Sequence, residues 1–414
     1  MTQTRYLIVG SSHAALETLR AIRQADREGT MAMLTRDAHL PYSPTILPYV
    51  VSGRSPASRV ILRDEKFFDE NACAFVANAT ATALDANAKT VSLAGGKTWH
   101  YEKLLIATGA APAIPPIPGL ENVCFHVLRS LDDAEGLRAS LRSARRAVVL
   151  GAGLIGLHAA ENLAEAGLAV SVVEMQPHVL PGYFDAVAST RIEAAFREHG
   201  VALHLAHRAV AVESNGGKAC TVRLEDGAGI EADLLLVAVG VKPTVEWLSG
   251  SGIALGKGVR VDGTMRTNVP DVWAAGDVAE ARDFHTGDPA LIGIIPTAVE
   301  QGRIAGMDMA GDAYLKPYPG GVPVNTFRFF GRVALSIGQT ANGGTEIAEH
   351  DAETYRRAVL ADGKLIGFSS VDEPFDVGVM GELIRRHIDL SECRESFLAR
   401  PLETGRRLMS EGWR

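Results

Sequence analysis

The sequence has few cysteines, and none lies close to another. The four are Cys73, Cys124, Cys220 and Cys393, and no C-x-x-C pair occurs. A dithiol relay, a zinc site or a cysteine-held iron–sulfur cluster is therefore not expected within this chain, and no metal site is predicted. Scattered single cysteines are typical of reduced thiols in a cytoplasmic protein, which is the location we expect.

Long apolar runs and an excess of basic residues are also missing. No stretch approaches the ~20 apolar residues of a transmembrane helix, so no membrane span is expected. The first predicted strand begins by about residue 5, which leaves no room for a cleavable leader. There are 41 Lys and Arg against 49 Asp and Glu, a formal net charge of −8. Because nucleic acids are held by clustered Lys and Arg, a nucleic acid partner is not predicted.

Two segments of the chain have a similar sequence pattern. The length of 414 residues also suggests more than one domain. RYLIVGSSHAALETLRAI at 5–22 resembles AVVLGAGLIGLHAAENLAEAG at 147–167. Each segment has an apolar strand, a glycine-containing turn and apolar positions at helical spacing. A second apolar strand follows each, at 30–36 and at 169–174. The pattern predicts two βαβ units, and therefore an α/β fold with parallel sheets.

Later segments extend this organisation. Apolar strands at 103–112 and 233–243 each end in a glycine turn and a proline, and the proline-rich segment 111–119 is typical of a crossover linker. From about residue 323 we expect strands, a hairpin at the D-G-K sequence 362–364, and a charged helical tail.

The second glycine loop predicts a dinucleotide site. Gly151, Gly153 and Gly156 have the G-x-G-x-x-G spacing. The first allows a tight turn, the second lets the backbone approach a pyrophosphate, and the third lets the helix pack on the strand. The free N–H groups at the helix N-terminus attract phosphate. Ile155 in this loop and Gly240 at the end of the strand in DLLLVAVG are assigned to the same NAD(H) site.

Glu174, at the end of the next strand, predicts which nicotinamide cofactor is used. A carboxylate there accepts hydrogen bonds from the adenosine ribose hydroxyls. It would repel a 2′-phosphate by roughly 4 kcal/mol at ~4 Å and an effective dielectric near 20. The next residues, Met175 and Gln176, supply no arginine to offset this repulsion. We therefore expect NADH rather than NADPH.

The first glycine loop is incomplete. Its pattern is Gly10-x-Ser12-x-x-Ala15, in which Ser and Ala replace two glycines but remain small. Taken alone, this pattern favours a nucleotide-binding site and a purely structural turn equally. A second dinucleotide fold, an A-T-G turn at 107–109 and an A-G-D at 275–277 in the same chain favour a site for FAD beside one for NAD(H).

Together these motifs resemble the FAD-dependent pyridine nucleotide–disulfide oxidoreductase superfamily. The similarity runs essentially end to end and is strongest to the branch of NADH peroxidases, NADH oxidases, coenzyme A disulfide reductases and ferredoxin or rubredoxin reductases. The motifs that carry it are VGSSHAA, PYSP, LLIATGAAP, GAGLIG followed by VVE, VAVGVKP, WAAGDVAE and TAVEQGRIAG.

The resemblance implies three domains. Two are Rossmann-like dinucleotide-binding domains, and the third is a C-terminal α+β interface domain that usually forms a homodimer. The expected boundaries are 1–113 with 246–322 for FAD, 114–245 for NAD(H) and 323–414 for the interface domain.

The resemblance also assigns residues to the FAD site. Asp277 would bind the ribityl chain, and a helix starting near Thr297 would point its positive end at the flavin. The full set is Gly10, Ser12, Ala15, Arg36, Thr45, Ala81, Thr108, Gly109, Gly276, Asp277 and Thr297.

The chain departs from the branch at its redox cysteine. The family pattern resembles Y-S-x-C, but PYSPT places Thr45 at that position. A hydroxyl cannot cycle through sulfenic acid or a mixed disulfide, which disfavours peroxidase, disulfide reductase and thiol-dependent oxidase chemistry. The histidine that faces the cysteine in relatives is retained as His13. It is either a structural remnant bonded to the Thr45 hydroxyl or a proton-handling catalytic residue beside the flavin.

Two smaller departures leave alternatives open. Where the family often has an acid for the FAD ribose, either Asp37 substitutes or Thr35 makes a weaker bond. After the second glycine loop, His158 replaces the usual glutamate, and it either binds the nicotinamide carboxamide or only fills space.

Without a thiol relay, electrons must enter and leave through the flavin itself. The sequence therefore predicts an enzyme that exchanges electrons between NAD(H) and an iron–sulfur or ferredoxin-type partner, as a homodimer or within a hetero-oligomeric complex. It resembles flavoprotein subunits of multi-subunit 2-oxoacid:acceptor oxidoreductases. One alternative is a stand-alone NADH oxidase or quinone reductase, and another is a non-catalytic flavin-binding structural or sensing subunit.

Overall fold

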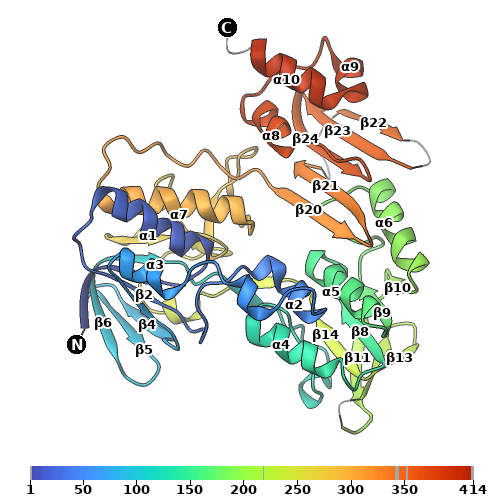
Figure 1. The fold of residues 1–414 in the computed structure, drawn as a ribbon, viewed down its shortest axis with the longest axis horizontal. Coiled ribbons are helices and arrows are strands. Elements are labelled where there is room, and N and C mark those ends of the chain that lie inside the picture. Colours follow the sequence, from blue (N-terminus) through green and yellow to red (C-terminus); the bar gives the residue numbers. More distant parts are fainter. Residues whose placement is uncertain (1, 218, 341–344, 351–352, 412–414) are drawn as a thin grey trace. The chain divides into compact units, whose positions relative to one another are not determined.

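The computed structural model describes residues 2–217, 219–340, 345–350 and 353–411 (Figure 1). The chain forms two compact units, each built from three separate segments. The first unit comprises Met1–Ile46, Pro56–Ala111 and Val241–Gly321. The second comprises Leu47–Ser55, Pro112–Gly240 and Val322–Arg414.

The first unit is organised around a sheet of mostly parallel strands. Strands β3, β2, β1, β6 and β17 lie side by side in parallel, and β5 and β4 extend the sheet from β6 in antiparallel pairing. The bounds are β1 (Thr2–Val9), β2 (Met31–Leu34), β3 (Cys73–Val76), β4 (Ala81–Asp85), β5 (Thr90–Leu93), β6 (Thr98–Ile106) and β17 (Val272–Ala274). The strands predicted near residues 5, 30 and 103 are confirmed.

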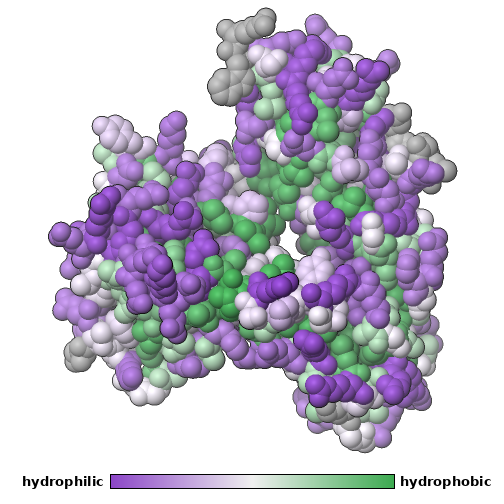
Figure 2. Space-filling view, viewed as in Figure 1, coloured by the Kyte–Doolittle hydropathy of each residue, from purple (hydrophilic) through white to green (hydrophobic). Residues whose placement is uncertain are grey.

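Helices α1 (His13–Ala25) and α7 (Ile295–Ala310) pack tightly on each other in this unit. A Cβ on Gly302 would overlap the Ala14 backbone, and a Cβ on Gly306 would lie 2.6 Å from the Thr18 carbonyl oxygen. The Thr18 hydroxyl donates to the Gly302 carbonyl at 2.7 Å. The backbones of the two helices are therefore in close contact. Hydrophilic side chains dominate the visible face of α1 and α3 (Glu65–Glu70) in Figure 2.

Shorter elements complete the first unit. Strand β16 pairs with β18, and β18 with β19, while β7 pairs with β15. The bounds are β7 (Ala110–Pro112), β15 (Val241–Pro243), β16 (Val259–Arg260), β18 (Ala279–Arg282), β19 (Pro289–Ala290), and the short 3-10 turns Pro44–Ile46, Ala57–Val60 and Glu246–Leu248.

The second unit contains the second βαβ unit, as the sequence predicts. Its four strands are parallel in the order β10, β9, β8, β14. A separate antiparallel sheet has the order β11, β12, β13. The bounds are β8 (Arg146–Leu150), β9 (Ala169–Glu174), β10 (Ala202–Leu205), β11 (Ala209–Ser214), β12 (Cys220–Leu224), β13 (Gly229–Ala232), β14 (Leu234–Val237), α2 (Leu47–Val51), α4 (Leu131–Ser140), α5 (Leu154–Glu165) and α6 (Ala186–Glu198), with a 3-10 turn at Leu120–Asn122.

The C-terminal part of this unit is a five-stranded antiparallel sheet with three helices. The strand order is β20, β21, β24, β23, β22. Asp362 and Gly363 form the expected hairpin turn, with φ of 49° and 75°, the left-handed conformation of a two-residue turn. The bounds are β20 (Val324–Phe329), β21 (Arg332–Gly338), β22 (Thr345–His350), β23 (Tyr355–Ala361), β24 (Lys364–Val371), α8 (Val377–Arg385), α9 (Arg394–Ala399) and α10 (Pro401–Glu411).

Two negative findings concern the described residues alone. None of their helices is long and apolar enough to cross a membrane. Their His, Cys, Asp and Glu side chains nowhere form a group of three or more that could hold a metal ion.

Candidate functional site

The second glycine loop has the geometry of a phosphate cradle. Gly151 has φ of 102°, and a Cβ there would lie 2.5 Å from the Ala238 carbonyl oxygen. A Cβ on Gly156 would overlap the Gly151 carbonyl. A Cβ on Gly153 would meet nothing within 4 Å. The fold therefore explains the first and third glycines, whereas the open space at Gly153 fits a ligand that approaches the backbone.

Glu174 is tied to this loop. It is the last residue of β9, and its Oε2 accepts a hydrogen bond from the Ala152 N–H at 2.8 Å. Its Oε1 accepts from the Gln176 N–H at 2.9 Å. Each carboxylate oxygen keeps a further lone pair, so the group can still accept hydrogen bonds from a ribose.

The other residues assigned to this loop are accessible. Ile155 is 40% exposed in the first turn of α5, and Gly240 is exposed with φ of 126° and open space around it. Met175, beside Glu174, is 58% exposed.

His158 lies further along α5. Its ring packs on Phe327 of β20 with centroids 4.8 Å apart, and burial lowers its pKa. Its Nε2 is buried and has no hydrogen-bond partner among the described residues. The imidazole is thus neutral near pH 7 and partly fills space against Phe327. Its contact with a carboxamide stays a prediction.

The first glycine loop follows the same plan with smaller changes. Gly10 has φ of 120°, and a Cβ there would overlap the Ala107 backbone. Ala15 is fully buried, so only a small side chain fits. Ser12 is exposed at the N-cap of α1, yet its hydroxyl makes no cap hydrogen bond.

The helices at the predicted cofactor sites share an uncapped N-terminus. Helices α1, α5 and α7 have no side-chain cap and no acidic residue in the first turn. By contrast, an aspartate or serine side chain caps each of α3, α4, α6 and α8. Uncapped backbone N–H groups remain available to an anionic ligand, so these ends fit phosphates and a flavin ring.

Hydrogen bonds hold two of the remaining first-unit motifs in place. The Thr108 hydroxyl donates to the Thr244 carbonyl at 2.9 Å, and the Thr244 N–H donates to the Gly109 carbonyl at the same distance. The Gly276 N–H donates to Oε1 of Gln301 in α7 at 2.9 Å. This bond holds the A-G-D turn against α7, which begins two residues before Thr297.

The sequence leaves two roles open for His13, and the structure describes other partners than Thr45 for its side chain. The His13 Nδ1 lies 3.2 Å from Ser12 Oγ, and the Thr45 Oγ1 lies 3.0 Å from Ser43 Oγ. Each side chain has a nearer partner in its own turn, which the sequence pattern did not indicate. Burial lowers the pKa of His13, and the nearby carboxylate of Asp277 opposes this change. The sequence did not foresee that His13 and Asp277 interact.

Thr35 and Asp37, which follow β2, differ in how accessible their oxygens are to a ribose. The Thr35 hydroxyl is buried and accepts from the Asp37 N–H at 3.3 Å. The Asp37 carboxylate is half-buried and accepts from the Tyr42 hydroxyl at 3.2 Å. Arg36 is exposed, and Ala81 is half-exposed at the start of β4. Asp37 is therefore the more accessible acceptor for a ribose.

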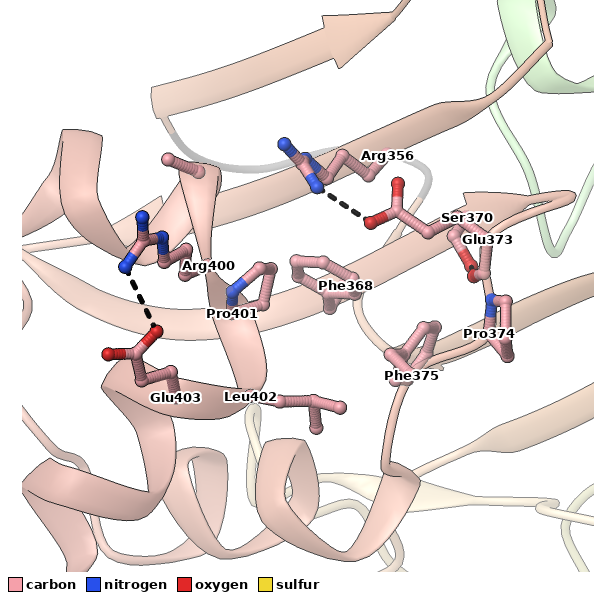
Figure 3. Close-up of a pocket in the computed structure, with 11 residues that line it drawn as sticks. Arg356, Phe368, Ser370, Glu373, Pro374, Phe375, Arg400, Pro401, Leu402 and Glu403 are labelled. Carbon is pink, nitrogen blue, oxygen red and sulfur yellow. Dashed lines mark hydrogen bonds and ion pairs between the residues drawn. The ribbon is translucent and has the colours of Figure 1, made fainter.

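A cavity of about 260 Å³ lies elsewhere, in the C-terminal part of the second unit (Figure 3). Phe368, Phe375 and Leu402 line it, and its two arginines form ion pairs, Arg356 with Glu373 and Arg400 with Glu403. None of its lining residues belongs to the predicted site.

Comparison with known proteins places the chain among flavin and nicotinamide enzymes. The sequence model of the family described as "Pyridine nucleotide-disulphide oxidoreductase" matches residues 4–302. The NADH-dependent phenylglyoxylate dehydrogenase subunit epsilon of Aromatoleum evansii is 51% identical over 99% of this chain and 98% of its own length. The rubredoxin-NAD(+) reductase of Pseudomonas putida is 29% identical over 92% of this chain and 98% of its own length.

Solved structures have the same fold. A ferredoxin reductase from Rhodopseudomonas palustris is 29% identical, with a TM-score of 0.82 over 89% of this chain and 91% of its own. Putidaredoxin reductase, in its complex with putidaredoxin, has a TM-score of 0.87 over 97% of this chain and 100% of its own, at 22% identity.

Proposed function

Since the chain belongs to the pyridine nucleotide-disulphide oxidoreductase family, an enzyme family whose members bind FAD and NADH, we propose that it exchanges electrons between NAD(H) and an iron–sulfur or ferredoxin-type protein. Bound FAD would supply the redox chemistry, accepting electrons in pairs and returning them singly or in pairs. We further propose that the partner is a subunit of the same complex, and that the complex is cytoplasmic.

The observation that carries the proposal is the hydroxyl of Thr45. It is exposed in the turn that holds the redox cysteine in related enzymes, and it contacts only Ser43 among the hydrogen-bonding groups described for it. Cys73 and Cys220 are buried in separate cores with raised pKa values, so neither substitutes. In this proposal electrons leave the flavin without a thiol, which favours a separate one-electron carrier. The 51% identical relative, itself named as a subunit, supports this reading.

In this proposal the chain's own residues bind and orient the two cofactors. The N–H groups at the uncapped ends of α1 and α5 would hold the two pyrophosphates, and Glu174 would hold the adenosine ribose of NADH. Gln301 fixes the turn that carries Asp277, which would orient the ribityl chain. In this proposal, residues 1–113 with 246–322 form the FAD domain, 114–245 the NAD(H) domain and 323–414 the interface domain.

The test begins with anaerobic titration of the natively purified protein with NADH. We expect stoichiometric bleaching of the flavin, slow oxygen consumption in air, and rapid reoxidation by the co-purifying iron–sulfur protein. Rapid turnover with oxygen alone would favour a stand-alone oxidase, and turnover with a quinone alone would favour a quinone reductase. Failure of NADH to bleach bound flavin would favour a non-catalytic subunit.

A further inference from the structure

The cavity in the C-terminal part of the second unit lies apart from every residue assigned to the two cofactors. Its volume is about 260 Å³, which is smaller than the roughly 300–1,000 Å³ of pockets that hold drug-sized ligands. The lining comes from β23, β24, the loop after β24, and the start of α10. A space of this size fits a molecule with a single ring or one branched aliphatic group.

Apolar side chains form much of the cavity wall. Phe375, Pro401 and Leu402 line it, and each keeps part of its surface exposed, so a ligand can reach them. Phe368 is 1% exposed and packs against Phe375, with ring centroids 4.8 Å apart and an interplanar angle of 76°. This edge-to-face contact holds the Phe375 ring in place. The interior therefore suits an apolar group of a ligand.

Two ion pairs border these apolar side chains, and they differ in how exposed they are (Figure 3). Arg356 Nη1 lies 2.6 Å from Glu373 Oε1, and the two side chains are 16% and 31% exposed. Arg400 Nη1 lies 3.3 Å from Glu403 Oε2, and these side chains are 74% and 71% exposed. An exposed pair of this kind adds little to stability, because water screens it. Arg400 and Glu403 can therefore turn from each other to a ligand.

Both members of the exposed pair keep unused hydrogen-bonding groups. A guanidinium has five N–H donors, and among the described residues Arg400 uses one of them, toward Glu403. Oε1 of Glu403 accepts no hydrogen bond from the described part of the chain. Leu402 and Glu403 also lie in the first turn of α10, where backbone N–H groups have no acceptor within the helix. The rim of the cavity thus offers donors to an anion and an acceptor to a cation, side by side.

We propose that this cavity binds a free α-amino acid with an apolar side chain. The α-carboxylate contacts Arg400 and the α-ammonium contacts Glu403, so that the charges of ligand and protein alternate. The apolar side chain enters the space beside Phe375, Pro401 and Leu402. A purely anionic ligand fits less well, because the lining holds two arginines and two glutamates, whose charges cancel.

Isothermal titration calorimetry of the natively purified full chain tests the site with L-phenylalanine and L-leucine. A ligand of this size should bind with a dissociation constant on the order of 1 mM. N-acetyl-L-phenylalanine lacks the ammonium group, and L-phenylalaninamide lacks the carboxylate. We expect each blocked compound to bind about tenfold more weakly than phenylalanine, because each loses one hydrogen bond between charged groups. Glycine, which has both charges but no apolar side chain, should show no binding.

Three variants locate the binding. Arg400→Gln should bind phenylalanine and its amide with similar affinity, because the partner of the carboxylate is gone. Glu403→Gln should likewise no longer distinguish phenylalanine from its N-acetyl form. Arg407→Gln is the matched control, since Arg407 lies in the same helix, is 53% exposed, pairs with Glu411 at 3.0 Å and does not line the cavity. It should keep the wild-type affinity, and thermal melting confirms that all three variants are folded.

Several results would overturn the proposal. One is that neither amino acid gives a heat of binding or a saturation-transfer NMR signal up to about 10 mM. Tighter binding of the N-acetyl compound than of phenylalanine would indicate a simple anion site instead. Equal losses of affinity in Arg400→Gln and Arg407→Gln would place the binding outside the cavity. The titration does not involve the flavin or NADH, so none of these results bears on the proposed function.

Discussion

The carboxylate of Glu174 accepts a hydrogen bond from the backbone N–H of Ala152 at 2.8 Å, which joins the end of β9 to the second glycine loop. The residue expected to bind the ribose therefore also holds the cradle expected to bind the pyrophosphate. A substitution at Glu174 should affect both cofactor choice and cofactor affinity.

Glu174→Ala should lose much of the preference for NADH over NADPH. The carboxylate repels a 2′-phosphate by up to roughly 4 kcal/mol at ~4 Å and an effective dielectric near 20, so removing it should change the ratio of kcat/KM values by about tenfold or more. Glu213→Ala is the control, because Glu213 is an exposed residue of β11 that pairs with Arg223. An unchanged ratio in Glu174→Ala would contradict the assignment.

Thiol alkylation should leave flavin reduction by NADH intact. Burial raises the pKa of Cys73 to about 12 and also raises those of Cys220 and Cys393, whereas Cys124 is exposed. Iodoacetamide at pH 8 should thus label Cys124 first, as mass spectrometry would detect, without slowing the stopped-flow reduction. A parallel loss of reduction and of free Cys124 would refute the thiol-free route.

Thr45→Cys should make the activity of the protein sensitive to thiol alkylation, unlike that of the wild type. An exposed thiol in the turn of Ser43 would be alkylated readily and would allow NADH-dependent cleavage of an aromatic disulfide. Ser43→Cys is the comparison, because Ser43 is buried in the same turn. Equal disulfide turnover by both variants would show that position 45 has no special access to the flavin.

His13→Gln should leave flavin reduction unchanged between pH 7 and 8. Burial lowers the pKa of His13 below its usual 6.5, so the imidazole is neutral in this range. A neutral imidazole can accept a proton, so a proton-handling role would appear as slower flavin reduction in the variant within this range, and that result would contradict the prediction.

His158 should make the protein less stable in mild acid. Burial depresses its pKa in the folded state, so the unfolded chain binds this proton more readily. The contribution to stability is complete above pH 6.5 and is lost as the pH falls toward the folded-state pKa. His158→Gln should therefore show a smaller drop in melting temperature between pH 7.5 and 5.5.

His207→Gln tests whether a histidine with a raised pKa has the opposite effect on the pH dependence of stability. The Leu205 carbonyl and the Asp226 carboxylate raise the pKa of His207, so its contribution is complete below pH 6.5 and is lost as the pH rises through the folded-state value. Its removal should make the acid-induced drop in melting temperature larger. Variants of the two histidines that change in the same direction would contradict the assignments.

Gly302→Ala should destabilise the first unit by about 1–3 kcal/mol, because a Cβ would overlap the Ala14 backbone. We expect a lower melting temperature and reduced FAD retention. Gly136→Ala in α4 is the control, since its Cβ meets nothing within 4 Å and alanine favours a helix by roughly 0.5–1 kcal/mol. Equal melting temperatures for the two variants would argue against the tight contact of α1 and α7.

Local patterns predicted most of the elements. Residues 5–22 and 147–167 each show the pattern of a strand, a glycine turn and an amphipathic helix. This pattern depends on interactions within one short segment, and the structure has the expected elements there, namely β1, α1, β8 and α5. The same holds for the Asp362–Gly363 turn, because its residue types accept positive φ. The sheet of β11, β12 and β13 was missed, since its short strands carry no strong alternation.

Contacts between distant segments could not be predicted. Nothing in the local sequence indicates that Gln301 accepts from Gly276, or that Tyr318 lies beside Thr297. The possible bond between His13 and Thr45 shows the reverse case, because Ser12 and Ser43 are hydroxyl partners next to them in the sequence. A family pattern fixes which residues lie near a site, but competition between neighbouring hydroxyls decides how they pair.

The contact of α1 with α7 has a consequence for redesign of the enzyme. Because Gly302 and Gly306 bring the two backbones together with only small side chains, such as those of Thr18 and Ala21, at the contact, the spacing of the two helices is set mainly by main-chain atoms. An engineer can therefore retune a group at a helix end, such as His13, by itself, while a cofactor analogue that needs a different spacing will require a new pair of helices.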